Sequence, residues 1–96
     1  MLYVAMCHDK PNSLDLRLAT RETHIVWLKS LGERVRISGP FFDESGKTMC
    51  GSVVIIEADS IDHAKATFAQ DPYAHAGLFA SVDIRPWLWV IGAPAA

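Results

Sequence analysis

The chain has 96 residues, a formal net charge of −2 and an apolar fraction of 50%. This length suits a single domain, predicted to span residues 1–96 with a flexible tail at 92–96. The near-neutral charge and the lack of a basic run argue against nucleic-acid binding. The apolar stretches are too short to span a membrane, and the N-terminus lacks the features of a signal peptide. We therefore expect a cytoplasmic protein with no membrane partner.

Cysteine and histidine usage gives no sign of a metal or disulfide framework. The two cysteines, Cys7 and Cys50, are too few for a disulfide scaffold, and we expect both to be reduced. The four histidines show no zinc-ligand spacing, and the chain has no glycine-rich phosphate loop and no nucleophile elbow. We therefore predict no metal and no cofactor.

Four strands are predicted from the two-residue alternation of apolar side chains. The segments 2–7 and 52–57 are apolar on both sides of this alternation, which indicates central strands. The segment 34–38 alternates between apolar and polar residues, as a half-exposed strand does. The segment 79–91 contains Pro86, which cannot donate to a sheet ladder, so this strand is also expected at an edge.

Two helices are expected between these strands. The first covers 14–31, with Asn12 or Ser13 as its N-cap and a stop at Gly32. The second covers 61–70. The first helix carries an apolar stripe at helical spacing, formed by Leu14, Leu18, Ile25 and Leu28.

The resulting order βαββαβ predicts an α+β fold with a four-stranded antiparallel sheet and two helices on one face. No helix is left to cover the other face, although the central strands are apolar there. We therefore expect this face to meet a second copy of the chain in a homodimer or a higher oligomer. A charged residue at Tyr3 or Val54 is expected to weaken the association. Trp87 and Trp89 are interpreted as interface anchors.

A short loop at 71–78 carries the first candidate site residues. Its Asp71-Pro72 pair favours the start of a short helical turn. The loop would present Asp71, Tyr73 and His75 between two regular elements, a place where loops often carry function. Tyr73 and His75 are predicted to line a small-molecule pocket, although His75 is equally well explained as a solvated loop residue.

His24, on the first helix, is the candidate acid or base because imidazole titrates near neutrality. Arg21 and Arg17 lie one and two turns earlier on the same side of that helix and would attract an anionic substrate. The alternative is a helix histidine bonded to a backbone carbonyl, beside two solvated arginines. His8 and Asp9 follow the first strand and are predicted to approach the same region.

Asp71 has two interpretations. As a site residue it would hold the His24 imidazole in one tautomer and stabilise its charged form. As a structural residue it would cap the turn that Pro72 begins. The two roles are compatible if each carboxylate oxygen takes one partner.

Several short motifs also occur in a characteristic order along the chain. They are Met1-Leu2-Tyr3-Val4, Asp9-Lys10-Pro11, Arg17-Leu18, Arg21, His24, Leu28, Gly39-Pro40, Gly51-Ser52, Asp71-Pro72-Tyr73 and Ala76-Gly77-Leu78. In this order and spacing the chain resembles the YCII-related, or YciI-like, proteins from residue 1 to about 89. It departs from them at Glu22, where they often carry Pro, and at His8, where an acidic or amide residue is common.

The resemblance implies a ferredoxin-like fold that dimerises through its sheets as a dimeric α+β barrel, with a site built around His24 and Asp71. It also implies similarity in fold to small lactone isomerases and to other enzymes of small, often aromatic molecules. One hypothesis is a cofactor-free lyase or isomerase in which His24 moves a proton and Arg17 or Arg21 holds an anionic group. The alternatives are a dimer that binds a small ligand without turnover and a purely structural dimer.

Overall fold

The computed structural model describes residues 1–95. Its elements follow the predicted order, with one turn of 3-10 helix at Gly32–Arg34 and a short third helix in addition. The strands are β1 (Leu2–Asp9), β2 (Val35–Phe42), β3 (Met49–Glu57) and β4 (Phe79–Trp87). The helices are α1 (Leu14–Ser30), α2 (Ile61–Phe68) and α3 (Pro72–His75).

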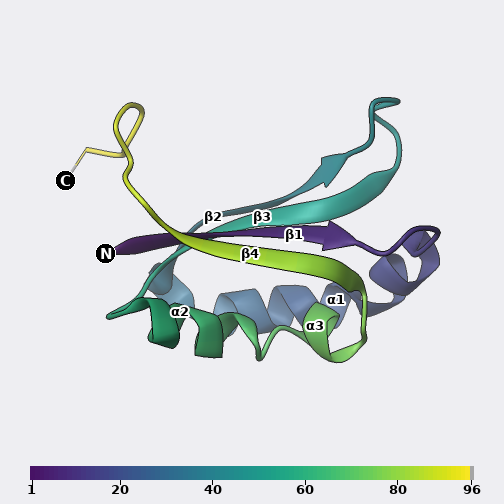
Figure 1. The fold of residues 1–96 in the computed structure, drawn as a ribbon, viewed down its shortest axis with the longest axis horizontal. Helices are drawn as coiled ribbons and strands as arrows, with labels where there is room; N and C mark the ends of the chain where they lie inside the picture. The colour runs from purple at the N-terminus through teal and green to yellow at the C-terminus, as the bar shows by residue number, and fades with distance from the viewer. Residues whose placement is uncertain (96) are drawn as a thin grey trace.

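The strands form one antiparallel sheet in the order β2-β3-β1-β4. This confirms that the two strands predicted to be apolar on both faces are central and that the other two are edges. The helices all lie on one side of the sheet, and within residues 1–95 no helix lies on the other side (Figure 1). The chain therefore has the predicted ferredoxin-like α+β fold.

The strand register divides the side chains of the sheet between these two faces. Tyr3 pairs with Ile56 and Ala5 with Val54, and all four are nearly fully buried in the core. The prediction that a charge at Tyr3 or Val54 would weaken subunit association was therefore wrong about the face. The open face, without helices, is formed in the central strands by the alternate residues, which include Leu2, Val4, Met6, Val53 and Ile55.

Helix α1 buries its predicted apolar stripe only in part, because Leu14, Ile25 and Leu28 are half-buried. Leu18 is 51% exposed, whereas the fully buried residues are Arg17 and His24. These two are seven residues apart and so lie on one side of the helix, as their spacing predicted. Ser13 is the N-cap residue, but its hydroxyl donates to the Pro11 carbonyl and makes no capping bond. The helix therefore packs through these two polar side chains together with partly buried apolar ones, of which Trp27 and Leu28 contact the core.

Strands β1, β2 and β3 are longer than predicted. β2 continues through Gly39 and Pro40. An edge strand tolerates proline because its outer edge has no neighbouring strand, so an N–H can be missing there without the loss of a ladder bond. A register shift near the start of β2 turns Ile37 to the open face and Ser38 to the helix side, the reverse of the predicted alternation. This shift brings Ser38 to the same side of the sheet as α1.

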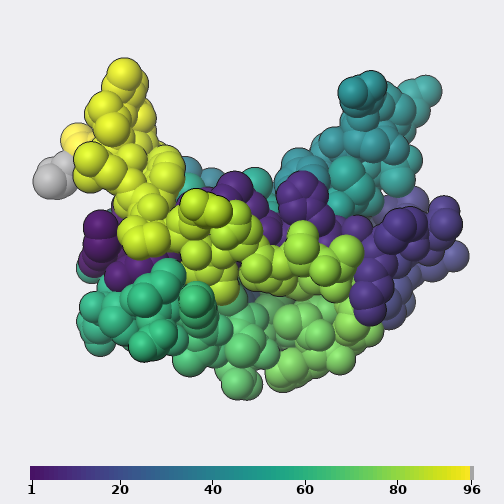
Figure 2. Space-filling view, in the orientation of Figure 1, coloured from purple at the N-terminus to yellow at the C-terminus, as the bar shows by residue number. Residues whose placement is uncertain are grey.

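Two segments rise from the sheet on its open side (Figure 1). One is the hairpin that joins β2 to β3, and the other is the chain after β4, which ends at Trp87 and not at residue 91. The space-filling view shows a hollow between the two (Figure 2). Apolar side chains of the C-terminal segment are largely exposed, with Ile91 at 87%. The predicted tail at 92–96 is described only to residue 95, without regular structure.

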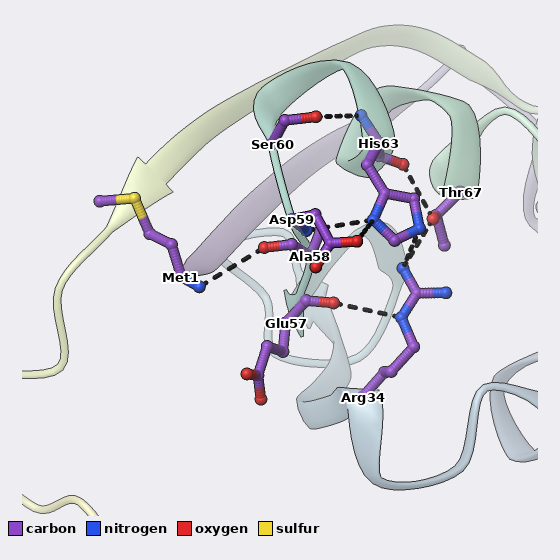
Figure 3. A network of polar contacts seen from close by, with 8 residues as sticks. All are labelled: Met1, Arg34, Glu57, Ala58, Asp59, Ser60, His63 and Thr67. Atoms are coloured by element: carbon purple, nitrogen blue, oxygen red, sulfur yellow. Dashed lines mark hydrogen bonds and ion pairs between the residues drawn. The ribbon is translucent and has the colours of Figure 1, made fainter.

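A polar network joins the carboxyl end of β3 to α2 (Figure 3). Arg34 donates from Nε to the Glu57 carbonyl at 3.2 Å and from Nη2 to Thr67 Oγ1 at 2.8 Å. Ser60 caps α2 by accepting the backbone N–H of His63 at 3.0 Å. The network fixes the second helix to the sheet.

Among residues 1–95, no helix is long and apolar enough to cross a membrane.

Candidate active site

His24 and Asp71 meet within one chain. His24 Nδ1 lies 2.7 Å from Asp71 Oδ1, and both side chains are largely buried. An ionised carboxylate can only accept hydrogen bonds, so the contact places a proton on Nδ1. In the neutral imidazole this leaves Nε2 with a free lone pair. The predicted pair is thus brought together, while its catalytic role stays a prediction.

Asp71 also caps α3. The same Oδ1 atom accepts the backbone N–H of Tyr73 at 2.9 Å, with Pro72 at the first helical position. The capping bond and the histidine contact therefore coexist, but on a single oxygen and not on one oxygen each as predicted. Gly77 ends the turn with a φ of 75°, which places the chain for β4.

The Tyr73 ring lies between His24 and Arg17. Its centroid is 4.0 Å from the His24 ring, with the planes 18° apart, and 4.7 Å from Arg17 Cζ. Arg17 and His24 are seven residues apart on α1, which is about 10 Å along the helix axis. A ring this close to both side chains therefore fills the space between them. The aromatic face therefore stacks on the imidazole and on the guanidinium.

Arg17 is held by three hydrogen bonds. Nε and Nη2 donate to the two oxygens of Asp9 at 2.6 and 2.9 Å, and Nη2 also donates to Ser52 Oγ at 2.9 Å. Burial opposes the charge on Arg17, but the hydrogen bonds and the charge of Asp9 outweigh it, so the pKa of Arg17 lies above its ordinary value. Arg17 is thus a fixed cation within the site, and not a solvated arginine.

A cavity of about 160 Å³ opens beside these groups. Roughly 150 Å³ suffices for benzene in an apolar cavity, so this one suits a single-ring molecule. Its polar lining consists of Arg17, Arg21, His24, Ser38, Ser52 and Tyr73. Its apolar lining is formed mainly by Ile25, Leu28, Pro40 and Met49. The cavity therefore offers one acid–base group and two cations to a ring held by aliphatic walls.

Two predicted site residues lie elsewhere. His8 has the register of the open face, where its ring centroid is 5.2 Å from that of Phe41, and it does not line the cavity. The reason is that β1 continues to Asp9, so its alternation sends Asp9 and not His8 to the helix side. His75 is exposed on α3 and is also absent from the lining, which favours its interpretation as a solvated residue.

Two residues of the site, Asp9 and Ser52, were assigned no role from the sequence. Asp9 was predicted to approach the region of the site from the turn after the first strand, and it does contact Arg17. Ser52 was placed only at the start of a strand, with no facing direction. Extending β1 by two residues would have put Asp9 on the same face as Cys7, and Cys7 pairs with Ser52. Both residues stood within the motifs that the family resemblance used, which was the available signal.

Cys7 is buried beneath the site and does not line the cavity. Burial, with a further contribution from the charge of Asp71, raises its pKa to about 12. Within residues 1–95, no group of three or more His, Cys, Asp or Glu side chains is placed to hold a metal ion. The residues present can move a proton at His24 and attract an anion with Arg17 and Arg21.

Residues 1–88 match the sequence profile of the YCII-related domain. The chain belongs to the YCII-related family. It is 37% identical to an uncharacterized protein of Haemophilus influenzae and 35% identical to protein YciI of Escherichia coli, each over 94 residues. Both alignments cover 91% of this chain and 96% of the relative. The family explains why the short motifs occur in one order.

Solved structures extend this relationship. This YCII-related chain is 32% identical to 5-chloro-2-hydroxyhydroquinone dehydrochlorinase from Burkholderia phenoliruptrix, solved with 2,5-dihydroxybenzoquinone, at a TM-score of 0.82. That match covers 92% of this chain and 94% of the other. An antibiotic biosynthesis monooxygenase gives a TM-score of 0.54 at 15% identity, over 92% of this chain and 99% of the other, and shares the fold alone.

Removing the counter-charge of Arg17 tests how the site is held together. We expect Asp9→Asn to lower the free energy of unfolding by about 3 kcal/mol, because it leaves a buried guanidinium without its anion. Urea unfolding followed by tryptophan fluorescence measures the change. The control is Asp83→Asn, which breaks the solvent-exposed pair with Arg85 and should cost less than about 1 kcal/mol. Equal losses of unfolding free energy in the two variants would show that the Asp9 contact stabilises the fold no more than an exposed ion pair does.

Proposed function

We propose that the protein is a lyase or isomerase that acts on a small oxygenated aromatic compound, with His24 as its general base. One observation carries the proposal: Asp71 holds Nδ1 at 2.7 Å while the same imidazole lines the cavity. A base fixed in one tautomer, with its other nitrogen free for a substrate, is suited to proton abstraction. The likeness to a dehydrochlorinase at 32% identity supports the substrate class.

The reaction would need no oxidant or reductant. His24 Nε2 takes a proton from the substrate, and the electron pair of the broken bond moves onto a conjugated oxygen to give an oxyanion. In a lyase, the imidazolium returns this proton to the ring carbon that carries the leaving group, so that this carbon becomes tetrahedral. Loss of a proton from a second, conjugated hydroxyl then expels the leaving group as an anion and forms a quinone. In an isomerase, the proton is returned to a different carbon. Asp71 stabilises the imidazolium that exists between the two steps.

The two cavity arginines have different tasks in this scheme. Arg17 is committed to Asp9 and Ser52 and cannot follow a substrate. Arg21 is exposed and lines the cavity, so its side chain is free to fold over an anionic group as the ligand enters. We assign substrate capture to Arg21 and a fixed positive potential to Arg17.

His24→Asn tests the proposed base. The Asn side-chain N–H₂ can still donate to Asp71, so the variant keeps the contact but loses Nε2. We expect release of chloride from 5-chloro-2-hydroxyhydroquinone to fall by about 10²–10⁴-fold, the usual contribution of a general base. Binding of the compound should change far less.

The matched control is His75→Asn, which removes an exposed imidazole from the same region and should retain full turnover. If His24→Asn turned over the compound as fast as the unmutated protein, the proposal would be overturned. If the unmutated protein bound the compound without releasing chloride, this compound would not be a lyase substrate, and the non-catalytic binding function would be favoured.

We further propose that the active form is a homodimer joined through the open face of the sheet. The central strands place Val4, Met6 and Val53 on this face, and the two rising segments leave a hollow over it (Figure 2). A monomer rarely leaves a continuous apolar face of this kind in water. The exposed apolar side chains after β4, including Leu88 and Ile91, would be buried in the same association.

Val53→Asp tests the interface without touching the core. A symmetric interface would bury the new charge twice, so we expect the dimer dissociation constant to rise at least about tenfold in sedimentation equilibrium. Leu18→Asp, on the outer side of α1, is the control and should leave association unchanged. A monomeric unmutated protein at micromolar concentration would refute the dimer.

A further inference from the structure

The cavity opens between α1 and the edge strand β2. Its exposed lining residues are Arg21 on α1 and Ser38 and Pro40 on β2. β2 lies at one edge of the sheet, and within residues 1–95 no strand lies beyond it. The mouth of the cavity is therefore bordered by a strand edge that the chain itself does not cover.

The same strand exposes apolar side chains beside the mouth. Ile37 precedes Ser38 and is 40% exposed, and Phe42, at the end of β2, is 48% exposed. The one charged residue of β2, Arg36, is paired with Glu57. An open strand edge with apolar side chains pairs readily with another chain unless charges or a covering element prevent it. The β2 edge is thus a surface suited to an apolar segment.

The chain after β4 is such a segment. Leu88, Val90 and Ile91 are 76%, 77% and 87% exposed. In the described chain, no backbone group of residues 88–95 bonds to another backbone group, although Trp89 Nε1 donates to the Ile91 carbonyl at 2.9 Å. Residues 88–91 therefore combine apolar side chains with largely free backbone groups. A strand that adds to an exposed sheet edge uses these two features.

The segment is long enough to reach a second subunit. It leaves the sheet on the open side, through which the proposed homodimer is joined (Figure 1). Two sheets that pack face to face lie about 10 Å apart. Four extended residues span about 13 Å, at about 3.3 Å per residue. Residues 88–91 can therefore reach the partner's sheet without any movement of β4.

The polarity of the two edge strands selects the edge that receives the segment. A two-fold axis can place β4 opposite the partner's β2 or opposite the partner's β4. The open face of β4 carries exposed Ser81, Asp83 and Arg85, and Asp83 pairs with Arg85. An apolar segment there would remove water from these polar groups. Opposite β2 it meets the partner's Ile37 and the partner's Phe42, and the two-fold axis buries both apolar sets in each subunit.

We propose that residues 88–91 of each subunit pack along the β2 edge of the partner and form the outer wall of the partner's cavity. The inference rests on the proposed homodimer and deepens it, because each site then contains residues of both subunits. Arg21, Ser38 and Pro40 form the mouth in one chain, and aliphatic side chains of the second chain complete it. A wall of this kind suits the uncharged edge of a single-ring ligand.

Cysteine cross-linking tests the placement of the segment. The full-length chain would carry Ser38→Cys and Val90→Cys, with Cys50→Ser to remove the half-buried thiol, while Cys7 is buried. We expect a bismaleimide to join the two new thiols between subunits and to give a covalent dimer on a denaturing gel. Each single cysteine variant should remain monomeric on the gel. The matched control pair is Glu22→Cys with Val90→Cys, because Glu22 lies on the outer side of α1 and does not line the cavity.

Val90→Ser tests whether the segment belongs to the ligand site. Loss of part of an apolar wall should raise Kd for 2,5-dihydroxybenzoquinone about threefold to tenfold in isothermal titration calorimetry. Val26→Ser is the matched control, because Val26 is also exposed, at 64%, and does not line the cavity. It should leave Kd unchanged.

The outcomes separate this inference from the proposed function. A dimer in sedimentation equilibrium without cross-linking of the Ser38→Cys, Val90→Cys chain would overturn the placement of the segment and leave the open-face homodimer standing. A monomer would overturn both. Cross-linking together with an unchanged Kd in Val90→Ser would overturn the assignment of the segment to the cavity wall. None of these results depends on chloride release, so the base role of His24 is tested separately.

Discussion

The Asp71 carboxylate determines how α3 sits against α1. One of its oxygens accepts the backbone N–H of Tyr73 and also makes the contact with His24. The same atom therefore caps α3 and joins two residues that are 47 positions apart in the sequence. Because the cap fixes the start of α3, it also fixes the direction of the Tyr73 ring. The ring then occupies the space between two side chains of α1. The cavity wall follows from this one carboxylate and the short helix it begins.

Helix α1 packs against the sheet in an unusual way for a helix of a small domain. Its fully buried residues are a charged arginine and a histidine, and its leucines lie toward solvent or only partly inside. A buried ion pair such as Arg17–Asp9 adds little net stability compared with apolar packing, because both charges lose their hydration. The chain thus places polar groups where packing alone would favour aliphatic ones. Such local conflicts with folding rules are expected at functional sites.

Most of the fold could be predicted from the sequence because sheet position leaves a clear pattern. Strands apolar on both faces proved central, and the strand with Pro86 proved an edge. Face assignments were less secure. A register shift in β2 reversed the predicted facing of Ile37 and Ser38, and no residue type in that strand predicts the shift. Tyr3 was assigned to the wrong face because both faces of β1 are apolar. His24, Asp71, Arg17, Arg21 and Tyr73 were identified from residue chemistry and family resemblance, and the structure brings them together. Asp9 was predicted only to approach the same region, and Ser52 was not identified, since their contact with Arg17 depends on strand ends that sequence patterns locate poorly.

The tautomer of His24 is the most direct measurement of the central claim. Long-range ¹H–¹⁵N spectra of the neutral imidazole distinguish the nitrogen that carries the proton from the one that does not. The account predicts a proton on Nδ1, bound to Asp71, and an unprotonated Nε2 that is free to act as a base. Asp71→Asn should weaken this preference. A neutral His24 with its proton on Nε2 in the unmutated protein would contradict the account, because no lone pair would then face the substrate.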